Sequence, residues 1–321
     1  MQFPRTILAA AMAAAAFTAA PAVAAEKVNY LLPAPAFLPA FGPWQIAKAK
    51  GYYEAEGLDV TFQTSKGGVD VAKQVGVGNA PIGGAIGDTS ILVRPNGIPV
   101  RSVAVMGGGS LVQVVARKDH GIEKIEDLKG KTMTVLSYQD TTFFASQGVL
   151  ASRGLTRNDV NIQAAGPQGV WKLVVQGKAD AMMGVPDWIG IVRANKIDVT
   201  IFNAMDYFPS MAQAIVASDE MIRKTPKLIQ GLVRASLKGL KDIMDDPKAA
   251  AEVFVKAVPR WKIPAIVGTF KMYNRYTYPG QSKLGAMDEK RLASLQDFYL
   301  KSGFIKKTSN VKDLFTNQFV Q

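Results

Sequence analysis

Short apolar segments of strand length alternate with helical segments along this chain, and that order constrains the fold more than any other feature. Strands are predicted at 28–32, 58–62, 80–85 and 100–106, where short apolar or alternating runs are bounded by Pro, Gly or Asn. Helices are predicted between them, at 44–50, 67–75 and 88–94. Strands and helices that alternate at this spacing indicate a mostly parallel sheet with helices on both faces.

The same order starts again near residue 111 and then gives way to a largely helical segment. Strands are predicted at 111–116, 132–136, 160–162, 179–183, 199–202 and 212–217, and an amphipathic helix at 288–302. Thr225-Pro226 and Asp246-Pro247 mark two helix starts, because Thr and Asp cap helices and Pro suits the first turn. No low-complexity linker divides the chain, so we predict an α/β protein of two lobes that exchange strands.

The first 24 residues have the three parts of a secretory signal peptide. Arg5 precedes an apolar run that extends to Phe17, and Ala22-Val23-Ala24 provides the small-residue cleavage pattern. A membrane anchor is the weaker interpretation, because a span needs about 20 strongly apolar residues. We therefore expect cleavage after Ala24 or Ala25 and a periplasmic protein that does not span the membrane.

The composition excludes several classes of function. The chain has no cysteine and a single histidine, His120, whereas a zinc site needs several such ligands. A Ser-His-Asp triad would have to use His120, which we interpret as a solvated loop residue. The net charge of +12 is spread over scattered Lys and Arg residues without a reading motif, which argues against nucleic-acid binding. No metal and no cofactor are predicted.

Candidate binding residues are found where predicted strands end and helices begin, because ligands of open α/β sheets bind there beside the free N–H groups of helices. The segments are 37–44, 83–90, 137–142 and 186–188, and the candidates are Phe37, Phe41, Trp44, Gly84, Asp88, Gln139, Asp140, Thr141, Thr142, Asp187 and Trp188. The aromatic candidates can equally belong to the core, and the Asp and Thr candidates can be ordinary helix caps. Gly107-Gly108-Gly109 lacks the ending of a phosphate loop and is interpreted as a flexible crossover.

Residues 44–60 resemble a signature of exported solute-binding proteins. The segment WQIAKAKGYYEAEGLDV is similar to A-x-x-K-G-Y-F-x-x-x-G-L-D-V. Weaker matches follow in order at 78–83, 127–131, 154–160, 177–181 and 303–317, with Pro81 in place of a usual acidic residue. The chain thus resembles the periplasmic receptors of ABC importers for nitrate, taurine, aliphatic sulfonates and thiamine-pyrimidine precursors.

This resemblance implies a type II periplasmic-binding-protein fold, in which two lobes joined by two hinge crossings close on a ligand. It implies lobe one at 26–111 plus 213–321 and lobe two at 112–212. The implied partners are a small-molecule solute and an ABC-importer permease, and a monomer is expected. Yeast-type pyrimidine synthases of this family use a cysteine-rich motif and histidines, so the composition disfavours that branch. An exported hydrolase, or a receptor that serves a sensor, remains an alternative.

The aromatic content of the candidate loops favours an aromatic or heterocyclic ligand over nitrate or taurine. These residues are Phe37, Phe41, Trp44, Phe143, Phe144, Trp188, Tyr207 and Phe208. We expect Trp44 to stack on the ligand and Thr141, with the N–H groups of its helix, to hold an acidic group. Asp187 would be too close to a ligand carboxylate unless it faces away or accepts a ring N–H.

Overall fold

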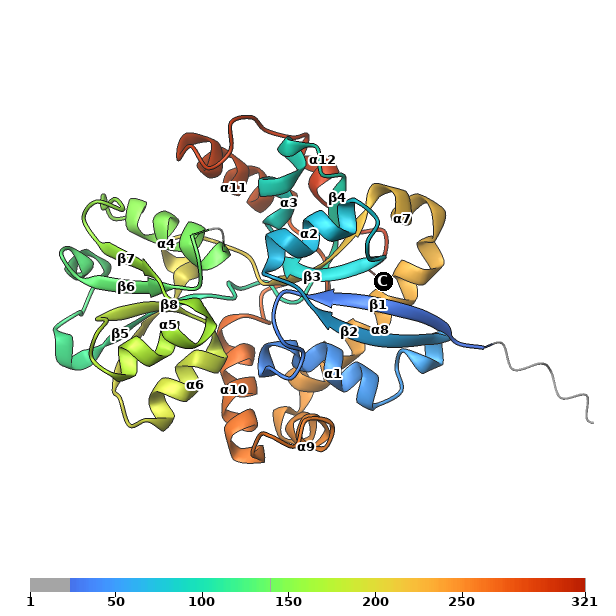
Figure 1. Cartoon of the computed structure of the whole chain (residues 1–321), viewed down its shortest axis with the longest axis horizontal. Helices are drawn as coiled ribbons and strands as arrows, with labels where there is room; N and C mark the ends of the chain where they lie inside the picture. Colours follow the sequence, from blue (N-terminus) through green and yellow to red (C-terminus); the bar gives the residue numbers. More distant parts are fainter. Residues whose placement is uncertain (1–23, 139, 321) are drawn as a thin grey trace, which may run out of the picture.

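Two five-stranded sheets organise the protein (Figure 1). The computed structural model describes residues 24–138 and 140–320; apart from Ala24, the predicted signal peptide lies outside these residues. The first sheet contains β1 (Glu26–Leu32), β2 (Leu58–Thr64), β3 (Ile82–Ile86), β4 (Val100–Val105) and β10 (Gln213–Ser218), in the order β2-β1-β3-β10-β4. The second contains β5 (Gln113–Arg117), β6 (Thr132–Val135), β7 (Asn161–Ala164), β8 (Ala181–Gly184) and β9 (Val199–Phe202), in the order β7-β6-β8-β5-β9.

Both sheets are mixed, because each contains one strand that runs against its neighbours. β10 is antiparallel to β3 and β4, and β5 is antiparallel to β8 and β9, whereas β1 pairs in parallel with β2 and β3, and β6 with β7 and β8. The predicted strands are therefore confirmed, as is the class of fold. We call the part built on the first sheet lobe one and the part built on the second sheet lobe two; the predicted boundary residues stay predictions.

Helices flank both sheets. Those of lobe one are α1 (Gly42–Ala49), α2 (Gly68–Gly76), α3 (Thr89–Val93), α7 (Asp219–Lys224), α8 (Pro226–Asp245), α9 (Pro247–Ala257), α10 (Ile263–Tyr276), α11 (Glu289–Lys301) and α12 (Val311–Leu314). Those of lobe two are α4 (Thr141–Ala151), α5 (Gly166–Val175) and α6 (Pro186–Ala194). Two helix starts confirm the sequence prediction, since α8 and α9 begin at Pro226 and Pro247, and the Asp246 side chain accepts the N–H groups of Lys248 and Ala249.

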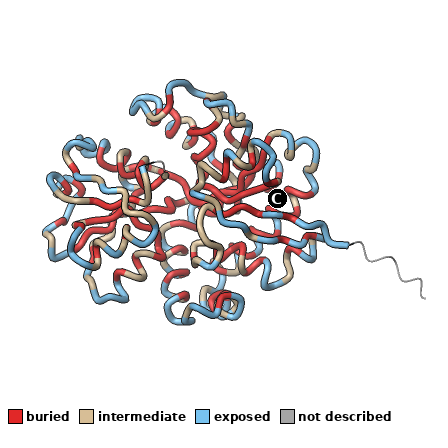
Figure 2. The backbone as a smooth tube through the Cα atoms, in the orientation of Figure 1, coloured by how far each residue is buried: buried red, intermediate tan, exposed pale blue. Residues whose placement is uncertain are grey.

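The largest hydrophobic core runs along the strands and continues from one lobe into the other. Figure 2 shows buried backbone through both sheets and the segments that join them. A smaller cluster, which includes Val170, Val174, Ile189 and Val192, fills the space between the second sheet and the helices α5 and α6. The continuity of the larger core indicates that the two lobes are packed against each other in this conformation.

The chain passes between the sheets twice, at 106–112 and at 203–212, and Arg291 of α11 joins the two crossings. Its guanidinium donates to the backbone oxygens of Gly108 and Gly109 in the first crossing and of Pro209 and Ser210 in the second. Burial lowers the pKa of Arg291 from its usual value. One side chain of lobe one thus holds both connections in register.

Gly107-Gly108-Gly109 lies in the first crossing, where close packing leaves no space for side chains. A Cβ on Gly107 would be 2.1 Å from the backbone oxygen of Thr277, and one on Gly109 would be 2.0 Å from that of Tyr276. Gly109 also donates its N–H to Thr277 O at 2.9 Å. This corrects the interpretation of the segment as a flexible crossover, because its backbone is clamped against the end of α10.

Candidate ligand-binding site

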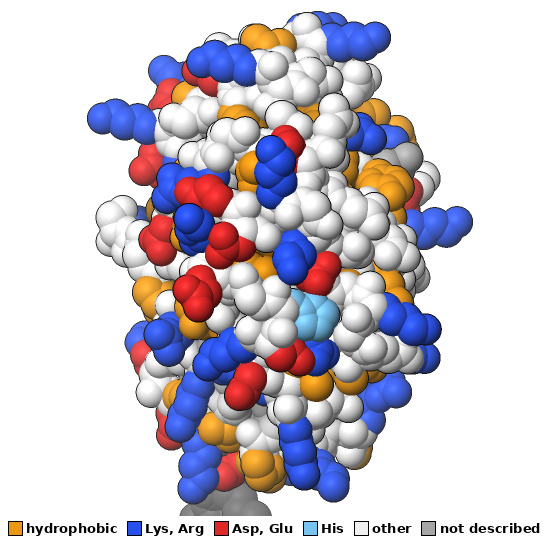
Figure 3. Space-filling view, turned by 90° about the vertical axis from the view of Figure 1, so that its left-hand side faces the viewer, with side chains coloured by type: hydrophobic (Ala, Val, Ile, Leu, Met, Phe, Trp, Pro, Cys, Tyr) orange, Lys and Arg blue, Asp and Glu red, His pale blue; other side chains and the backbone are white. Residues whose placement is uncertain are grey.

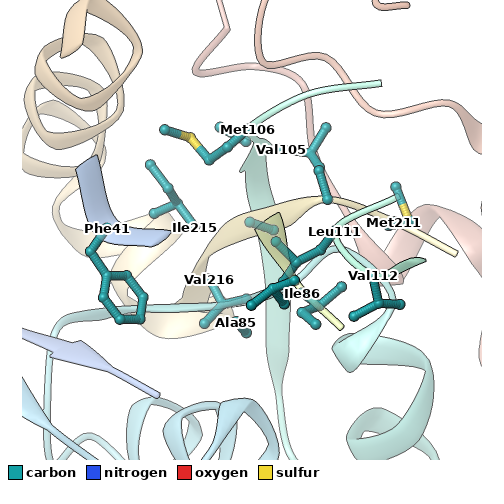
Figure 4. Packing of buried hydrophobic residues seen from close by; sticks show 14 of the residues in the cluster. Phe41, Ala85, Ile86, Val105, Met106, Leu111, Val112, Met211, Ile215 and Val216 are labelled. Atoms are coloured by element: carbon teal, nitrogen blue, oxygen red, sulfur yellow. The ribbon is translucent and has the colours of Figure 1, made fainter. Parts of the chain in front are cut away.

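A pocket lies between the lobes, where strands from both sheets end. Its walls are the loop after β1, the start of α2, the end of β3, the first crossing, the loops after β6 and β8, and the start of β10. Four apolar side chains from lobe one and the first crossing are among its lining residues, namely Phe41, Ile86, Leu111 and Val112. Figure 4 shows them within the buried hydrophobic core. The pocket thus lies at strand ends, where the sequence analysis places the candidate residues; their role in binding stays a prediction.

The pocket has a small inner part and a wider outer part. The inner cavity measures about 100 Å³ and the outer one about 560 Å³, and they share lining residues such as Leu38, Asp140 and Trp188. A cavity of about 150 Å³ accommodates benzene. The inner part is therefore suited to one edge of a small ring, and the rest of a ligand would extend into the outer part.

Six of the predicted residues line the inner cavity. They are Phe41, Asp140, Thr141, Thr142, Asp187 and Trp188. They come from both lobes, because Phe41 follows β1 and the other five begin α4 or α6. The structure thus brings together candidate side chains from three of the four predicted segments, 37–44, 137–142 and 186–188. Gln139 lies outside the described residues.

Trp44 does not reach the pocket, which corrects its expected position. It is fully buried in lobe one, its ring meets those of Tyr30 and Phe41 edge to face, and its Nε1 donates to Tyr30 Oη at 2.8 Å. Because α1 begins at Gly42, Trp44 falls on the helix face that packs onto the core. Its indole is thus already hydrogen-bonded and enclosed, so it is not available to stack on a ligand.

Three other predicted residues also lie away from the lining of the pocket. The Phe37 ring is 36 % exposed and contacts the Arg260 guanidinium at 3.9 Å. Gly84 lies inside β3, where an added Cβ would meet Leu32 Cδ2 at 3.2 Å. Asp88 is fully buried and accepts the Tyr299 hydroxyl at 2.6 Å. Gly84 and Asp88 thus pack inside lobe one, whereas Phe37 lies at its surface.

Most of the remaining aromatic residues form one cluster that joins α4 to α11, and they too are absent from the lining of the pocket. Its members are Phe143, Phe144, Phe208, Phe298, Tyr299 and Phe304. Phe144 and Phe304, from opposite lobes, have ring centroids 5.0 Å apart. The aromatic content that suggested an aromatic-lined site is thus largely used to pack the lobes together, and Phe41 and Trp188 supply the aromatic surface of the pocket.

Asp187 connects the lobes from inside the pocket. Its Oδ2 accepts the Ala40 N–H and its Oδ1 accepts the Tyr273 hydroxyl, both at 3.0 Å. Burial raises the pKa of Asp187 to about 6, although these two hydrogen bonds favour the charged form. Because Asp187 begins α6 of lobe two and both partners belong to lobe one, this carboxyl group ties the lobes together in this conformation.

Asp140 occupies the N-terminus of α4. Its Oδ1 accepts the Thr142 N–H at 2.9 Å and the Thr142 hydroxyl at 2.8 Å, and Thr142 Oγ1 accepts the Leu136 N–H. Burial raises the pKa of Asp140. A carboxyl group already caps this helix, so a ligand carboxylate held beside Thr141 would meet a negative charge.

Gln213 is a lining residue that the sequence analysis missed. Its side chain is almost fully buried at the start of β10, Nε2 donates to Ala40 O at 2.9 Å, and Oε1 has no partner among the described residues. The available signal was a single amide at the head of the apolar strand QAIVAS, next to the second crossing. That signal locates the residue but does not show where its amide points.

The only histidine is not part of the pocket. Figure 3 shows the outer face of lobe two, where His120 lies among acidic and basic side chains. Its Nδ1 is 2.7 Å from Asp180 Oδ1. Among the residues that the structure describes, no group of three His, Asp or Glu side chains is placed to hold a metal ion. None of the described helices combines the length and apolarity needed to cross a bilayer.

Comparison with known proteins identifies the family. Residues 39–250, more than half of the chain, match the family described as NMT1/THI5 like. The chain belongs to the NMT1/THI5-like family. Its similarity to the riboflavin-binding protein RibY of Chloroflexus aurantiacus is 26 % identity over 96 % of this chain and 91 % of the relative. The 4-amino-5-hydroxymethyl-2-methylpyrimidine phosphate synthase THI12 of Saccharomyces cerevisiae is 23 % identical over 79 % of this chain and 77 % of that protein.

A solved structure shows how this NMT1/THI5-like chain relates to a known fold. The alkanesulfonate-binding protein SsuA from Xanthomonas axonopodis pv. citri, bound to MOPS, superimposes with a TM-score of 0.73 at 14 % identity. The match covers 93 % of this chain and all of that one. The similarity confirms the periplasmic-binding-protein fold, with two lobes, each built on a mixed five-stranded sheet.

Proposed function

We propose that this protein is an exported, periplasmic receptor that binds a small organic solute between its lobes and delivers it to an ABC-importer permease. The observation that carries the proposal is the pocket at the strand ends of both sheets, closed by the Asp187 carboxyl group. The similarity to a riboflavin-binding protein and the fold shared with the alkanesulfonate-binding protein support it. The signal-peptide pattern at residues 1–24 supports export.

The lining of the pocket favours a planar aromatic or heterocyclic solute. Phe41 and Trp188 provide ring surfaces, and Ile86, Leu111 and Val112 make the inner walls apolar. No Lys, Arg or His occurs among the described residues that line the inner cavity. A nitrate or a sulfonate buried there would lack a charged partner, and burying an unpaired charge is strongly unfavourable.

Closure of the lobes is the step that we propose for ligand capture. The residues that line the pocket come from both lobes, so a bound solute stabilises the arrangement in which they meet. Arg291 holds the two crossings and the aromatic cluster holds α4 against α11. These contacts form the structural basis of a closed state that a permease can distinguish from the open one.

Binding measured by thermal unfolding and by tryptophan fluorescence tests the proposal. Mature protein is screened against riboflavin, aminopyrimidines, aromatic acids, alkanesulfonates, taurine and nitrate. A true ligand at about 100 times its Kd should add about 2.7 kcal/mol to the free energy of unfolding. Trp188→Leu should remove both the affinity and the fluorescence response, whereas Trp171→Phe, which changes the core of lobe two, should keep them. The absence of a shift with every compound would refute the proposal.

An enzyme is the second candidate, because a relative from yeast is named as a synthase. We propose a receptor instead, since His120 pairs with Asp180 on lobe two and does not line the pocket. His120→Ala should leave the ligand affinity unchanged. Turnover of a bound compound by the wild type, lost in that variant, would reverse the assignment. Capture of the ligand-loaded protein by membranes that contain the cognate permease separates an import receptor from one that serves a sensor.

A further inference from the structure

The direction of the Gln213 amide is set by its surroundings. The Ala40 carbonyl accepts a hydrogen bond from Nε2 at 2.9 Å, and an amide turned the other way would place two acceptor oxygens against each other. The backbone of Gln213 is also held, because its oxygen accepts the Met106 N–H at 2.7 Å and β10 is bonded to β3 and β4. Oε1 is therefore a fixed acceptor.

The residue that carries this acceptor lines the pocket, and the acceptor is buried without a partner among the described residues. Gln213 lines the inner cavity with 4 % of its surface exposed, and Oε1 makes no hydrogen bond to any described residue. Buried acceptors are usually satisfied, because leaving one unpaired in an apolar environment is unfavourable. The other polar groups nearby include the carboxyl groups of Asp140 and Asp187, which are acceptors when ionised. A molecule that satisfies Oε1 must therefore present a hydrogen-bond donor.

Gln213 is also linked to the contact that closes the lobes. The Ala40 carbonyl oxygen accepts a hydrogen bond from Gln213 Nε2, and the Ala40 N–H donates one to Asp187 Oδ2. Asp187 in turn accepts the Tyr273 hydroxyl. A continuous chain of hydrogen bonds thus runs from β10 of lobe one, through the loop after β1, to α6 of lobe two.

We propose that Gln213 is a specificity-determining and positioning residue, whose Oε1 accepts an N–H or O–H of the solute while its Nε2 holds Ala40 in place for Asp187. This inference rests on the proposed receptor function and deepens it. The solute then carries a hydrogen-bond donor on the edge that enters the inner cavity. Recognition at Oε1 and closure at Asp187 are coupled, because one rigid amide serves both.

Two pairs of probes, in each of which methylation removes the N–H donors of one nitrogen, test the donor requirement. They are riboflavin with 3-methylriboflavin, and 4-aminopyrimidine with 4-dimethylaminopyrimidine. In the wild type, the N–H member of at least one pair should bind at least about tenfold more tightly than its methylated partner. Gln213→Met should reduce that ratio to about 1, because the thioether is a poor acceptor of similar length. This comparison of affinities within one variant does not depend on its stability.

Asn274→Leu is the matched control. Asn274 donates from Nδ2 to Ile243 O at 2.8 Å, and its Oδ1 is also buried without a partner among the described residues. It packs α10 against α8 and does not line the pocket. The control should keep the preference for the N–H probe. A preference that is equally lost in this variant would show a general loss of rigidity and overturn the assignment to Gln213.

Gln213→Glu separates recognition from closure. At pH 9, well above the pKa of about 6 that burial gives the nearby Asp187, the carboxylate keeps an acceptor toward the cavity but loses the donor to Ala40 O, so it should retain the preference for the N–H probe. The decrease in radius of gyration on binding, measured by small-angle X-ray scattering, should be smaller than in the wild type. A decrease equal to that of the wild type would overturn the coupling.

The remaining outcomes distinguish the failure of this inference from that of the receptor function. Methylated probes that bind as tightly as their parents, or tight binding of methanesulfonate or nitrate alone, would overturn the donor requirement and leave the receptor intact. An anion held by the N–H groups at the start of α2 would produce the latter result. The absence of binding by any probe would refute both.

Discussion

Replacing Asp187 with asparagine should make the protein more stable relative to the wild type as the pH rises. The carboxyl group has an ordinary pKa of 3.8, which burial raises to about 6 in the folded protein. Its neighbours are the Ala40 N–H, the Tyr273 hydroxyl and the Tyr278 ring, and it forms no ion pair among the described residues. No positive charge therefore compensates for the buried carboxylate.

The sign and the size of the effect follow from proton linkage. The folded state binds the Asp187 proton more tightly than the unfolded state does, so this group's contribution is complete below pH 4. It is lost as the pH rises through about 6. The two pKa values differ by an amount that corresponds to about 3 kcal/mol. Asp187→Asn removes this titration while its amide can still accept the Ala40 N–H. Because part of this effect falls below pH 4, the difference in unfolding free energy, variant minus wild type, should increase by about 2.4 kcal/mol between pH 4 and pH 7.

Urea unfolding of the ligand-free protein at pH 4, 5, 6 and 7, followed by tryptophan fluorescence, measures this difference. Asp88→Asn is the control, because burial raises the pKa of Asp88 to about 6 as well, yet this carboxyl group lies away from the pocket. Both variants should show the same pH trend, and only Asp187→Asn should change the ligand affinity. A difference that stays constant within about 0.5 kcal/mol from pH 4 to 7 would refute the argument, because it would mean that water reaches Asp187 in solution.

Three further substitutions test the packing that surrounds the site. Trp44→Ala should lower the free energy of unfolding by about 3–5 kcal/mol in urea titrations and leave the affinity unchanged, because the ring fills the core beside Tyr30. Gly148→Ala should lower the free energy of unfolding by about 1–3 kcal/mol, and with it the melting temperature, since the added Cβ would be 2.3 Å from the Phe208 ring. An unchanged melting temperature would contradict that packing. Arg291→Met should lower the unfolding free energy by about 3 kcal/mol or more, because four backbone oxygens lose their donor, and X-ray scattering should show a larger radius of gyration without ligand.

The elements of the fold could be predicted because their signals are local. The start of α9 is an example: Asp246 caps it and Pro247 occupies the first turn, and both preferences act within a few residues. The strand β2 was equally predictable, since its buried and exposed residues alternate at its start. Such signals do not depend on where the rest of the chain lies.

The site was predicted less completely, because facing a pocket or a core is decided by distant contacts. Trp44 and Trp188 both follow a strand and begin a helix, yet Trp44 packs beside Tyr30 whereas Trp188 lines the cavity. Gln213 escaped notice for a related reason. Its free acceptor exists only because Ala40, distant in the sequence, takes the other end of the amide.

The position of β10 affects the order in which the protein can fold. This strand lies between β3 and β4 in the first sheet, but the whole second sheet comes before it in the chain. Residues 113–202 can therefore complete their sheet early, whereas β3 and β4 keep unpaired edges until Ser218 has been made. Such non-local pairing slows folding, and open edges favour aggregation. For a chain that is exported as we propose, the sheet of lobe one can therefore be completed only after β10 has emerged from the membrane.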